Sequence, residues 1–227
     1  MAPEQELFAT KSDFAYRAVR HRILGGEVEP GQVLNQAALA KDLGISTTPL
    51  REALRRLRSE GLVELESHRD ARVTPLSAGE AQDLLEVRRS LDPLAVSLAA
   101  QRRTEADVTA MRAALAEVSS LGQHPTYEEL IAHRRLHRAL YSASHNEVLT
   151  TTLDGLWDTA DRYRRAGARS AADEGYRHRK AREHAELVDL VARGEAEQAA
   201  ALMLQHIDTS LGAQAAAALA QPSQPAS

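Results

Sequence analysis

The sequence predicts a mainly α-helical protein: an N-terminal winged helix-turn-helix followed by a larger C-terminal all-α helical bundle. Residues 32–74 contain two short helical patterns separated by a glycine turn, and then two short alternating strands. After Thr74 the apolar residues recur only at helical spacing. The composition agrees, because 43% of residues are hydrophobic but only 4% are aromatic, which is typical of cores built from Leu, Ala and Val.

Composition also bounds the domain organisation and the class of protein. We expect disordered termini at residues 1–11 and 221–227, a winged helix-turn-helix domain at 12–75 and an all-helical domain at 76–220. The absence of cysteine excludes disulfides and thiolate metal sites. No apolar run approaches the roughly 20 residues that span a bilayer, and residues 1–11 do not resemble a signal peptide. We therefore expect a cytoplasmic protein with no membrane partner.

The N-terminal domain is predicted from its caps and apolar stripes. A first helix starts at Ser12 or Asp13 and stops at Gly25–Gly26, and Asn35 caps a second, which Gly44 ends. A third begins near Ser46, where hydroxyl caps and an early proline belong. The predicted inward residues are Ala38, Leu39 and Leu43 in the second helix and Leu50, Leu54 and Leu57 in the third. Residues 62–65 and 71–74 alternate like the two strands of a hairpin, with the turn at 67–70.

The polar side of the third helix indicates DNA binding. Helix-turn-helix proteins place the start of this helix in the major groove, where hydroxyls suit phosphates and Arg suits a guanine edge. The alternative is that these polar side chains only face solvent and bind nothing. Net charge is −4 overall, but residues 13–75 carry ten Lys/Arg against nine Asp/Glu, so one copy should bind weakly and we expect a homodimer on two-fold-related operator DNA. The candidate DNA-binding residues are Thr47, Thr48, Arg51, Arg55, His68 and Arg69.

This stretch resembles a known family. The sequence GISTTPLREALRRL at 44–57, followed by EGLV at 60–63, resembles the recognition-helix signature of GntR-type bacterial transcription regulators. ILGG at 23–26 and EPG at 29–31 are similar to that family's first helix and its exit. Family members often have Arg in place of Thr47, a basic residue near Ala37 and Gly in place of Asp70. The resemblance implies the fold, but these departures mean that no operator sequence carries over.

The second domain is predicted as helices only. Ser77 and Glu80 form a capping box that starts a long helix, which Pro93 should kink or break, with Ala95 to Ala100 continuing it. The remaining predicted helices are residues 104–121, 126–144, 146–169, 175–193 and 195–220.

Four histidines of this domain share apolar helix faces. His133 and His137 are one turn apart, and His184 and His206 fall on the inward faces of two further helices. Neutral imidazoles ligate Zn, Ni, Co or Fe, and a metal would satisfy several buried nitrogens at once. The alternative is a set of ordinary hydrogen-bonded core histidines.

A second resemblance bears on this choice. LHRAL at 136–140, followed by SHN at 144–146, resembles the C-terminal effector domain of FadR-type GntR regulators, called FCD. In its metal-binding members three histidines match His137, His184 and His206, and a fourth ligand, usually Asp, stands where this chain has His133. The resemblance implies a divalent metal, with Zn favoured over Ni, Co and Fe. Whether His133 ligates it, or water or effector takes its place, stays open.

The same resemblance implies an effector site. Arg88 matches an arginine that lines the effector cavity, and a guanidinium beside a metal would clamp a carboxylate. Its alternative role is a salt bridge with Glu86 or Asp92. Asn146 matches a position near the pocket, and its alternative role is a helix cap.

We therefore predict a DNA-binding transcription regulator, a homodimer whose operator affinity is controlled by a small carboxylate bound near a histidine-coordinated metal. A metal-responsive regulator without an organic effector is the alternative. A metal-dependent enzyme is disfavoured, because Arg134 rather than Glu follows His133 and no phosphate loop or nucleophile signature is present.

Overall fold

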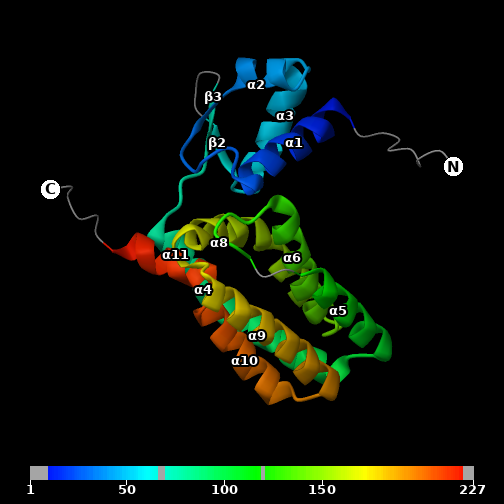
Figure 1. Ribbon diagram of the computed structural model, residues 1–227. Coiled ribbons are helices and arrows are strands. Elements are labelled where there is room, and N and C mark those ends of the chain that lie inside the picture. The colour runs from blue at the N-terminus through cyan, green and yellow to red at the C-terminus, as the bar shows by residue number, and fades with distance from the viewer. Residues whose placement is uncertain (1–9, 66–69, 119–120, 222–227) are drawn as a thin grey trace. The chain divides into compact units, whose positions relative to one another are not determined.

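The computed structural model describes residues 10–65, 70–118 and 121–221 (Figure 1). The chain forms two compact units, residues 1–76 and 77–227. As predicted, the protein is mainly α-helical, with a winged helix-turn-helix unit followed by a helical unit. No helix in the described ranges is both long and apolar enough to cross a lipid bilayer.

The first unit packs three helices against a small antiparallel sheet in the order β1-β3-β2. The interior of the third helix is the predicted leucine stripe, since Leu50, Leu54 and Leu57 have no exposed surface. The helices are α1 (Lys11–Gly25), α2 (Gln36–Asp42) and α3 (Thr47–Ser59), and the strands are β1 (Val33–Asn35), β2 (Val63–Leu65) and β3 (Asp70–Val73).

The structure corrects several local predictions in this unit. Thr10 and Asp13 form a capping box that starts α1 at Lys11, so residues 10 and 11 are ordered in that helix, while 1–9 lie outside the described residues. Strand β1 has no sequence signal because it is only three residues long and gains its conformation by pairing with β3. Ala38 is exposed, and Gln36 and Ala40 face inward in its place.

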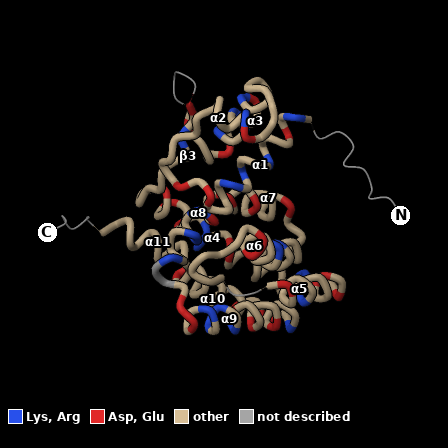
Figure 2. The backbone as a smooth tube through the Cα atoms, turned by 45° about the horizontal axis from the view of Figure 1, so that its top comes forward, with Lys and Arg blue, Asp and Glu red and all other residues tan. Residues whose placement is uncertain are grey.

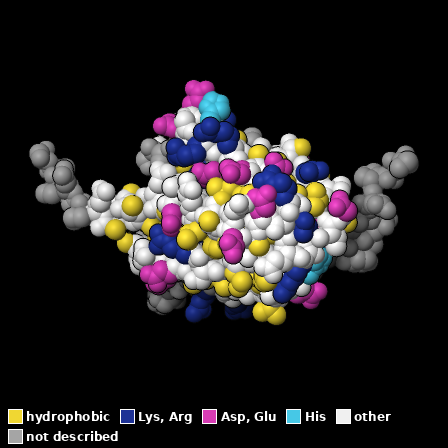
Figure 3. Space-filling model, turned by 90° about the horizontal axis from the view of Figure 1, so that it is seen from below, with side chains coloured by type: hydrophobic (Ala, Val, Ile, Leu, Met, Phe, Trp, Pro, Cys, Tyr) yellow, Lys and Arg dark blue, Asp and Glu magenta, His cyan; other side chains and the backbone are white. Residues whose placement is uncertain are grey.

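The second unit is a bundle in which α4 packs against α10 and α11, and α11 packs against α8. Hydrophobic side chains and charges of both signs are interspersed over the face drawn in Figure 3. The helices are α4 (Ala78–Arg102), α5 (Glu105–Glu117), α6 (Tyr127–Ser142), α7 (Glu147–Gly155), α8 (Trp157–Ala171), α9 (Glu174–Arg193), α10 (Ala196–Asp208) and α11 (Leu211–Ala220).

Four helix predictions in the second unit differ in detail from the structure. The helix predicted at 104–121 ends at Glu117. Helix α4 continues through Pro93, so the break that was one of the two expected effects of this proline does not occur. The buried packing of α4 against α10 and α11 outweighs the missing backbone bond. The single helix predicted at 146–169 is two helices that meet at Leu156. The one predicted at 195–220 is also two, since Ser210 caps α11. The tail predicted from residue 221 lies outside the described residues after Gln221.

Candidate functional site

Four histidines from three helices meet inside the second unit. His133 and His137 come from α6, His184 from α9 and His206 from α10, and all four are buried. Each offers a ring nitrogen, and these four nitrogens lie within 4.8 Å of one another. The helical spacing of apolar residues had placed each histidine inward, and the bundle brings them together.

The unpartnered nitrogens of this cluster fit a metal ion. Nδ1 of His133, Nε2 of His137 and both ring nitrogens of His184 are buried without a hydrogen-bond partner. Buried polar atoms are rarely left in this state, because each costs free energy. Tetrahedral zinc with bonds of about 2.0–2.1 Å needs its nitrogens roughly 3.4 Å apart, so a small inward movement of the rings would complete such a site.

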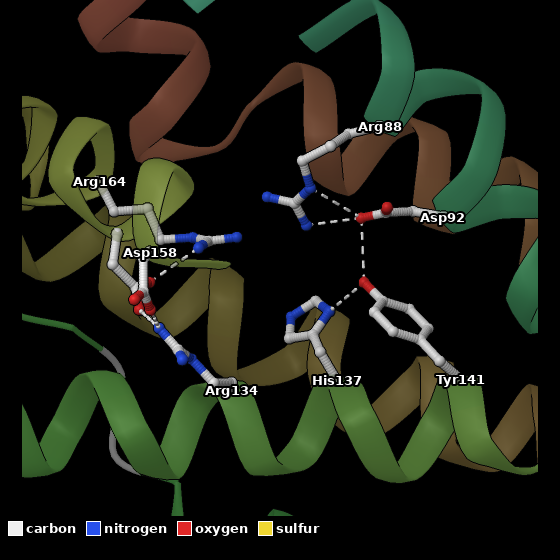
Figure 4. A network of polar contacts seen from close by, with 8 residues as sticks. Arg88, Asp92, Arg134, His137, Tyr141, Asp158 and Arg164 are labelled. Carbon is white, nitrogen blue, oxygen red and sulfur yellow. Dashed lines mark hydrogen bonds and ion pairs between the residues drawn. The ribbon is translucent and has the colours of Figure 1, made fainter. Parts of the chain in front are cut away.

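A hydrogen-bond chain fixes the tautomer of His137 (Figure 4). The Tyr141 hydroxyl donates to Oδ2 of Asp92 at 2.9 Å, so its oxygen accepts from Nδ1–H of His137, also at 2.9 Å. Burial, followed by the charge of Asp92, raises the pKa of Tyr141 well above its usual value, which keeps the hydroxyl protonated. Nε2 of His137 is thereby left with a free lone pair for a metal.

A second carboxylate performs the same task for His206. Nδ1–H of His206 donates to Oε2 of Glu183 at 2.8 Å, which leaves Nε2 free. Lys180 donates to the same carboxylate oxygen at 2.6 Å. Burial alone would raise the pKa of Glu183, but hydrogen bonds from His206 and Lys180 lower it to about 2. Glu183 is therefore a charged outer partner of the cluster.

All four imidazoles are neutral at pH 7. Burial, the largest cause, lowers the pKa values of His133, His137 and His184 well below the usual value, and neighbouring cations add to the effect. It also lowers the pKa of His206 to about 4, although the hydrogen bond to Glu183 opposes the shift. Neutral imidazole is the form that binds metals.

A small cavity of about 20 Å³ adjoins three of the histidines. Arg164 and Lys180 are the charged residues of its wall. Arg164 projects from α8, pairs with Asp161 at 2.9 Å and lies over the Trp157 ring at 4.5 Å. The other lining residues are Leu121, His133, Tyr176, His184, His206, Ile207, Ser210 and Leu211.

The two predicted effector residues lie in different parts of the second unit. Arg88 is buried near the cluster, but its Nε and Nη2 bond to Asp92 at 3.1 and 2.5 Å, so the salt bridge expected as its alternative role is present. Asn146 caps α7 by accepting from the backbone N–H of Leu149 at 3.2 Å. It lines a separate surface pocket beside Arg138 rather than the histidine cavity, so we do not retain it as an effector residue.

Sequence reasoning missed the residues that surround the histidines. Arg164, Lys180 and Glu183 were not singled out, although each falls at a buried position of its helix. One signal was present: Lys180, Glu183 and His184 share a face of α9 at helical spacing with Leu187. Nothing in the sequence indicates that Asp92 and Tyr141, 49 residues apart, share a hydrogen bond.

The predicted DNA-reading face is exposed on α3. Thr47, Thr48, Arg51 and Arg55 are all exposed, and Arg51 donates from Nε to Oε1 of Gln36 at 3.2 Å. Arg56 differs, because it lies over the Tyr16 ring at 3.7 Å and pairs with Glu60 at 3.4 Å. Figure 2 shows basic positions along α2 and α3. His68 and Arg69, the predicted wing contacts, lie outside the described residues.

Comparison with known families decides the identity of both units. Residues 11–73 match the family model "Bacterial regulatory proteins, gntR family". Residues 83–209 match the FCD domain, which covers more than half of the chain. This chain belongs to the GntR family. It is an FCD-containing GntR regulator, and its role is regulation of transcription through DNA rather than catalysis.

Relatives of this GntR regulator are themselves transcription regulators. The Nta operon transcriptional regulator of Aminobacter aminovorans is 33% identical over 178 residues, which covers 78% of this chain and 82% of that protein. LutR of Bacillus subtilis is 33% identical over 205 residues, with 82% and 92% covered. The solved structure of Escherichia coli McbR/YncC has a TM-score of 0.72 at 21% identity, over 93% of this chain and 98% of that one, and so shares the fold.

Proposed function

We propose that this GntR regulator binds a divalent metal through His133, His137, His184 and His206, and that a small carboxylate bound beside the metal controls its affinity for operator DNA. The observation that supports the metal is the convergence of four buried histidines from three helices, with unpartnered ring nitrogens on His133, His137 and His184. Zinc is the preferred ion, because four neutral nitrogen donors suit its tetrahedral site, and nickel, cobalt and iron are the other candidates. The bound metal would supply a positive charge that its neutral ligands do not compensate, and this charge would attract an anion.

The DNA-binding part of the proposal assigns the exposed face of α3 to the operator. Thr47, Thr48, Arg51 and Arg55 share this face, and we propose that two copies of the chain present it to two-fold-related half-sites. Exposed apolar side chains on packed neighbours α4 and α10, namely Val87, Leu94 and Leu204, support association of the second units. Light scattering of the full chain measures the oligomeric state, and a monomer at micromolar concentration would contradict the homodimer.

A second candidate function is a metal-responsive regulator without an organic effector. The small cavity favours it, because about 20 Å³ holds little more than one water molecule. The two candidates differ in what changes DNA affinity. Removal of the metal alone would do so in the second, whereas the first also requires an acid.

The test begins with metal content, measured by mass spectrometry on untagged protein. We expect near-stoichiometric metal in the wild type and its loss in the double variant His137→Ala, His184→Ala, with the exposed His178→Ala as the control that keeps it. A wild type that takes up neither zinc nor nickel would contradict the metal site.

The second step measures DNA affinity, using a fragment selected from random DNA by repeated binding. We expect Arg55→Ala to weaken binding, and acids from a carboxylate panel to change the affinity of the metal-loaded protein by about 5–150-fold. Affinity that stays constant across that panel, but responds to chelation, would favour the second candidate.

A further inference from the structure

The charges that face the histidine cavity are all positive. Arg164 and Lys180 line it, while their carboxylate partners, Asp161 and Glu183, are not among the described lining residues. Both cations are buried, with 4% and 3% of their surface exposed. The cavity therefore presents positive charge in a place that water does little to screen.

Arg164 has hydrogen-bonding capacity left, whereas Lys180 does not. The Lys180 ammonium donates to Glu183 at 2.6 Å, to the backbone oxygen of His206 at 3.1 Å and to Thr209 at 2.7 Å, which uses its three protons. Within the described parts of the chain, the Arg164 guanidinium makes one ion pair, from Nη1 to Asp161. A guanidinium has five N–H donors, so Arg164 is the cation that is able to receive a ligand.

The charge of Arg164 is incompletely compensated. Its partner Asp161 also pairs with Arg134 at 2.8 Å. Burial, followed by the nearby charge of Arg88, lowers the pKa of Arg164 to about 10, against the opposing effect of Asp161. A buried cation in this state is stabilised by any anion that reaches it.

Arg88 stands opposite Arg164. Figure 4 shows the two guanidinium groups directed toward each other, one from α4 and one from α8. Both lie near the Trp157 ring, at 5.3 and 4.5 Å from its centre. Two like charges that face each other in a buried space repel, and an anion between them removes the repulsion.

We infer that Arg164 is the principal anion anchor of the effector site, with Arg88 opposite it, and that the ligand is a small acid with two oxygen-donor groups. One carboxylate binds between the arginines. The second group, a carboxylate or a hydroxyl, faces the histidines. This inference rests on the proposed function, because four neutral imidazoles leave a divalent metal its full charge and so make it a second attractor for oxygen.

The size of the cavity restricts the acid further. About 20 Å³ does not hold even a small dicarboxylate, so binding requires part of the wall to move. Leu121, Tyr176 and Leu211 are apolar lining residues that also belong to one core cluster. Since moving them costs packing energy, a short acid is favoured over a long one.

The experiment is calorimetric titration of the full chain, loaded with zinc and metal-free. Malonate and glycolate are the two-group probes, acetate is the one-group probe, and phosphate is an inorganic anion. The variant is Arg164→Gln, and the control is Arg169→Gln, which removes the same charge from an exposed position of the same helix. Zinc content is measured in every sample.

We expect malonate or glycolate to bind the zinc-loaded wild type about tenfold or more tightly than acetate does. Arg164→Gln should weaken that binding about tenfold or more with zinc content unchanged, and Arg169→Gln should leave it unchanged. Full affinity in Arg164→Gln would overturn the anchor, and so would a wild type that binds none of the acids at millimolar concentration. Phosphate binding as tightly as malonate would overturn the ligand class.

Three further readouts separate this inference from the metal proposal and from misfolding. Malonate binding that depends on Arg164 in a protein that takes up no zinc would support the anchor while contradicting the metal. Arg164→Lys keeps the charge and the pairing with Asp161, so it should retain part of the affinity. In the wild type, the Nε–H resonance of Arg164 should shift on saturation with malonate, and an unmoved resonance would contradict direct contact.

Discussion

At the scale of single residues, the histidine cluster depends on side chains that do not touch the proposed metal. Glu183 and Asp92 each hold a proposed ligand histidine in the tautomer that frees Nε2, directly for His206 and through Tyr141 for His137. Each carboxylate has its own buried cation, Lys180 or Arg88. The imidazoles therefore sit among ion pairs that orient them while adding no net charge.

Replacing Glu183 tests this orienting role. Glu183→Gln keeps the shape of the side chain but removes the charge that holds Nδ1–H of His206, so zinc affinity should fall about 10–100-fold. Competition with a chromophoric chelator measures it. Glu186→Gln, on the exposed side of the same helix, should have no effect, and Glu183→Asp should recover part of the loss. Unchanged zinc affinity together with an unchanged His206 tautomer by NMR would show that Glu183 only packs.

The lowered histidine pKa values predict an acid-sensitive metal-free protein. Above about pH 7 these histidines are unprotonated in both the folded and the unfolded chain, so they do not lower the free energy of unfolding. As the pH falls below the unfolded value of about 6.5, the unfolded chain takes up protons that the folded cluster refuses, and the free energy of unfolding drops. The drop approaches about 1.4 kcal/mol per pH unit for each histidine, and for His206 it continues to its folded pKa of about 4.

Urea unfolding of the metal-free protein between pH 7.5 and pH 5 measures this slope, and it stays above the range in which Glu183 titrates. His184→Gln removes one of the protonating groups and should flatten the slope. A free energy of unfolding that does not change over this range would mean that the cluster accepts protons when folded.

At the scale of elements, sequence patterns predicted where residues are helical better than they predicted where one helix ends and the next begins. Apolar spacing placed all four histidines inward, and the caps at Asn35 and Ser77 begin helices as expected. The breaks at Leu156 and Thr209–Ser210 were missed, because the flanking helices fit one period. The surroundings of the histidines were missed for a different reason: Arg and Glu usually lie at the surface, and only the packing of the helices buries Arg164 and Glu183.

The contact between α8 and α11 depends on Gly167. A Cβ at this position would lie 2.0 Å from the backbone oxygen of Leu211, so Gly167→Ala should separate the two helices and destabilise the protein by about 1–3 kcal/mol. Gly155→Ala is the matched control, since a methyl group added there would meet no packed neighbour within 4 Å and Ala favours the helix by up to about 1 kcal/mol. Urea unfolding compares them, and equal stabilities would contradict the close approach.

At the scale of the whole molecule, the proposed function requires that ligand binding in the second unit alters DNA binding by the first. The chain passes from one unit to the other through Leu76 and Ser77. The Tyr163 hydroxyl accepts from the backbone N–H of Ser77 at 3.1 Å and also bonds the Glu80 carboxylate. Tyr163 precedes Arg164 on α8, so one turn of helix contacts both the histidine cavity and the start of the unit.

Tyr163→Phe tests whether this turn transmits the ligand signal. The variant removes the bonds to Ser77 and Glu80 and leaves Arg164 and the histidines in place, so zinc content and acid affinity should be unchanged. The acid-dependent change in DNA affinity should shrink by roughly 0.5–2 kcal/mol, because movement of α8 no longer shifts Ser77. Fluorescence anisotropy with the selected DNA measures it, with Tyr127→Phe as the control hydroxyl. A full response in Tyr163→Phe would mean that the signal reaches residue 77 along α4, whose first turn begins at Ala78 and whose buried interior includes Arg88.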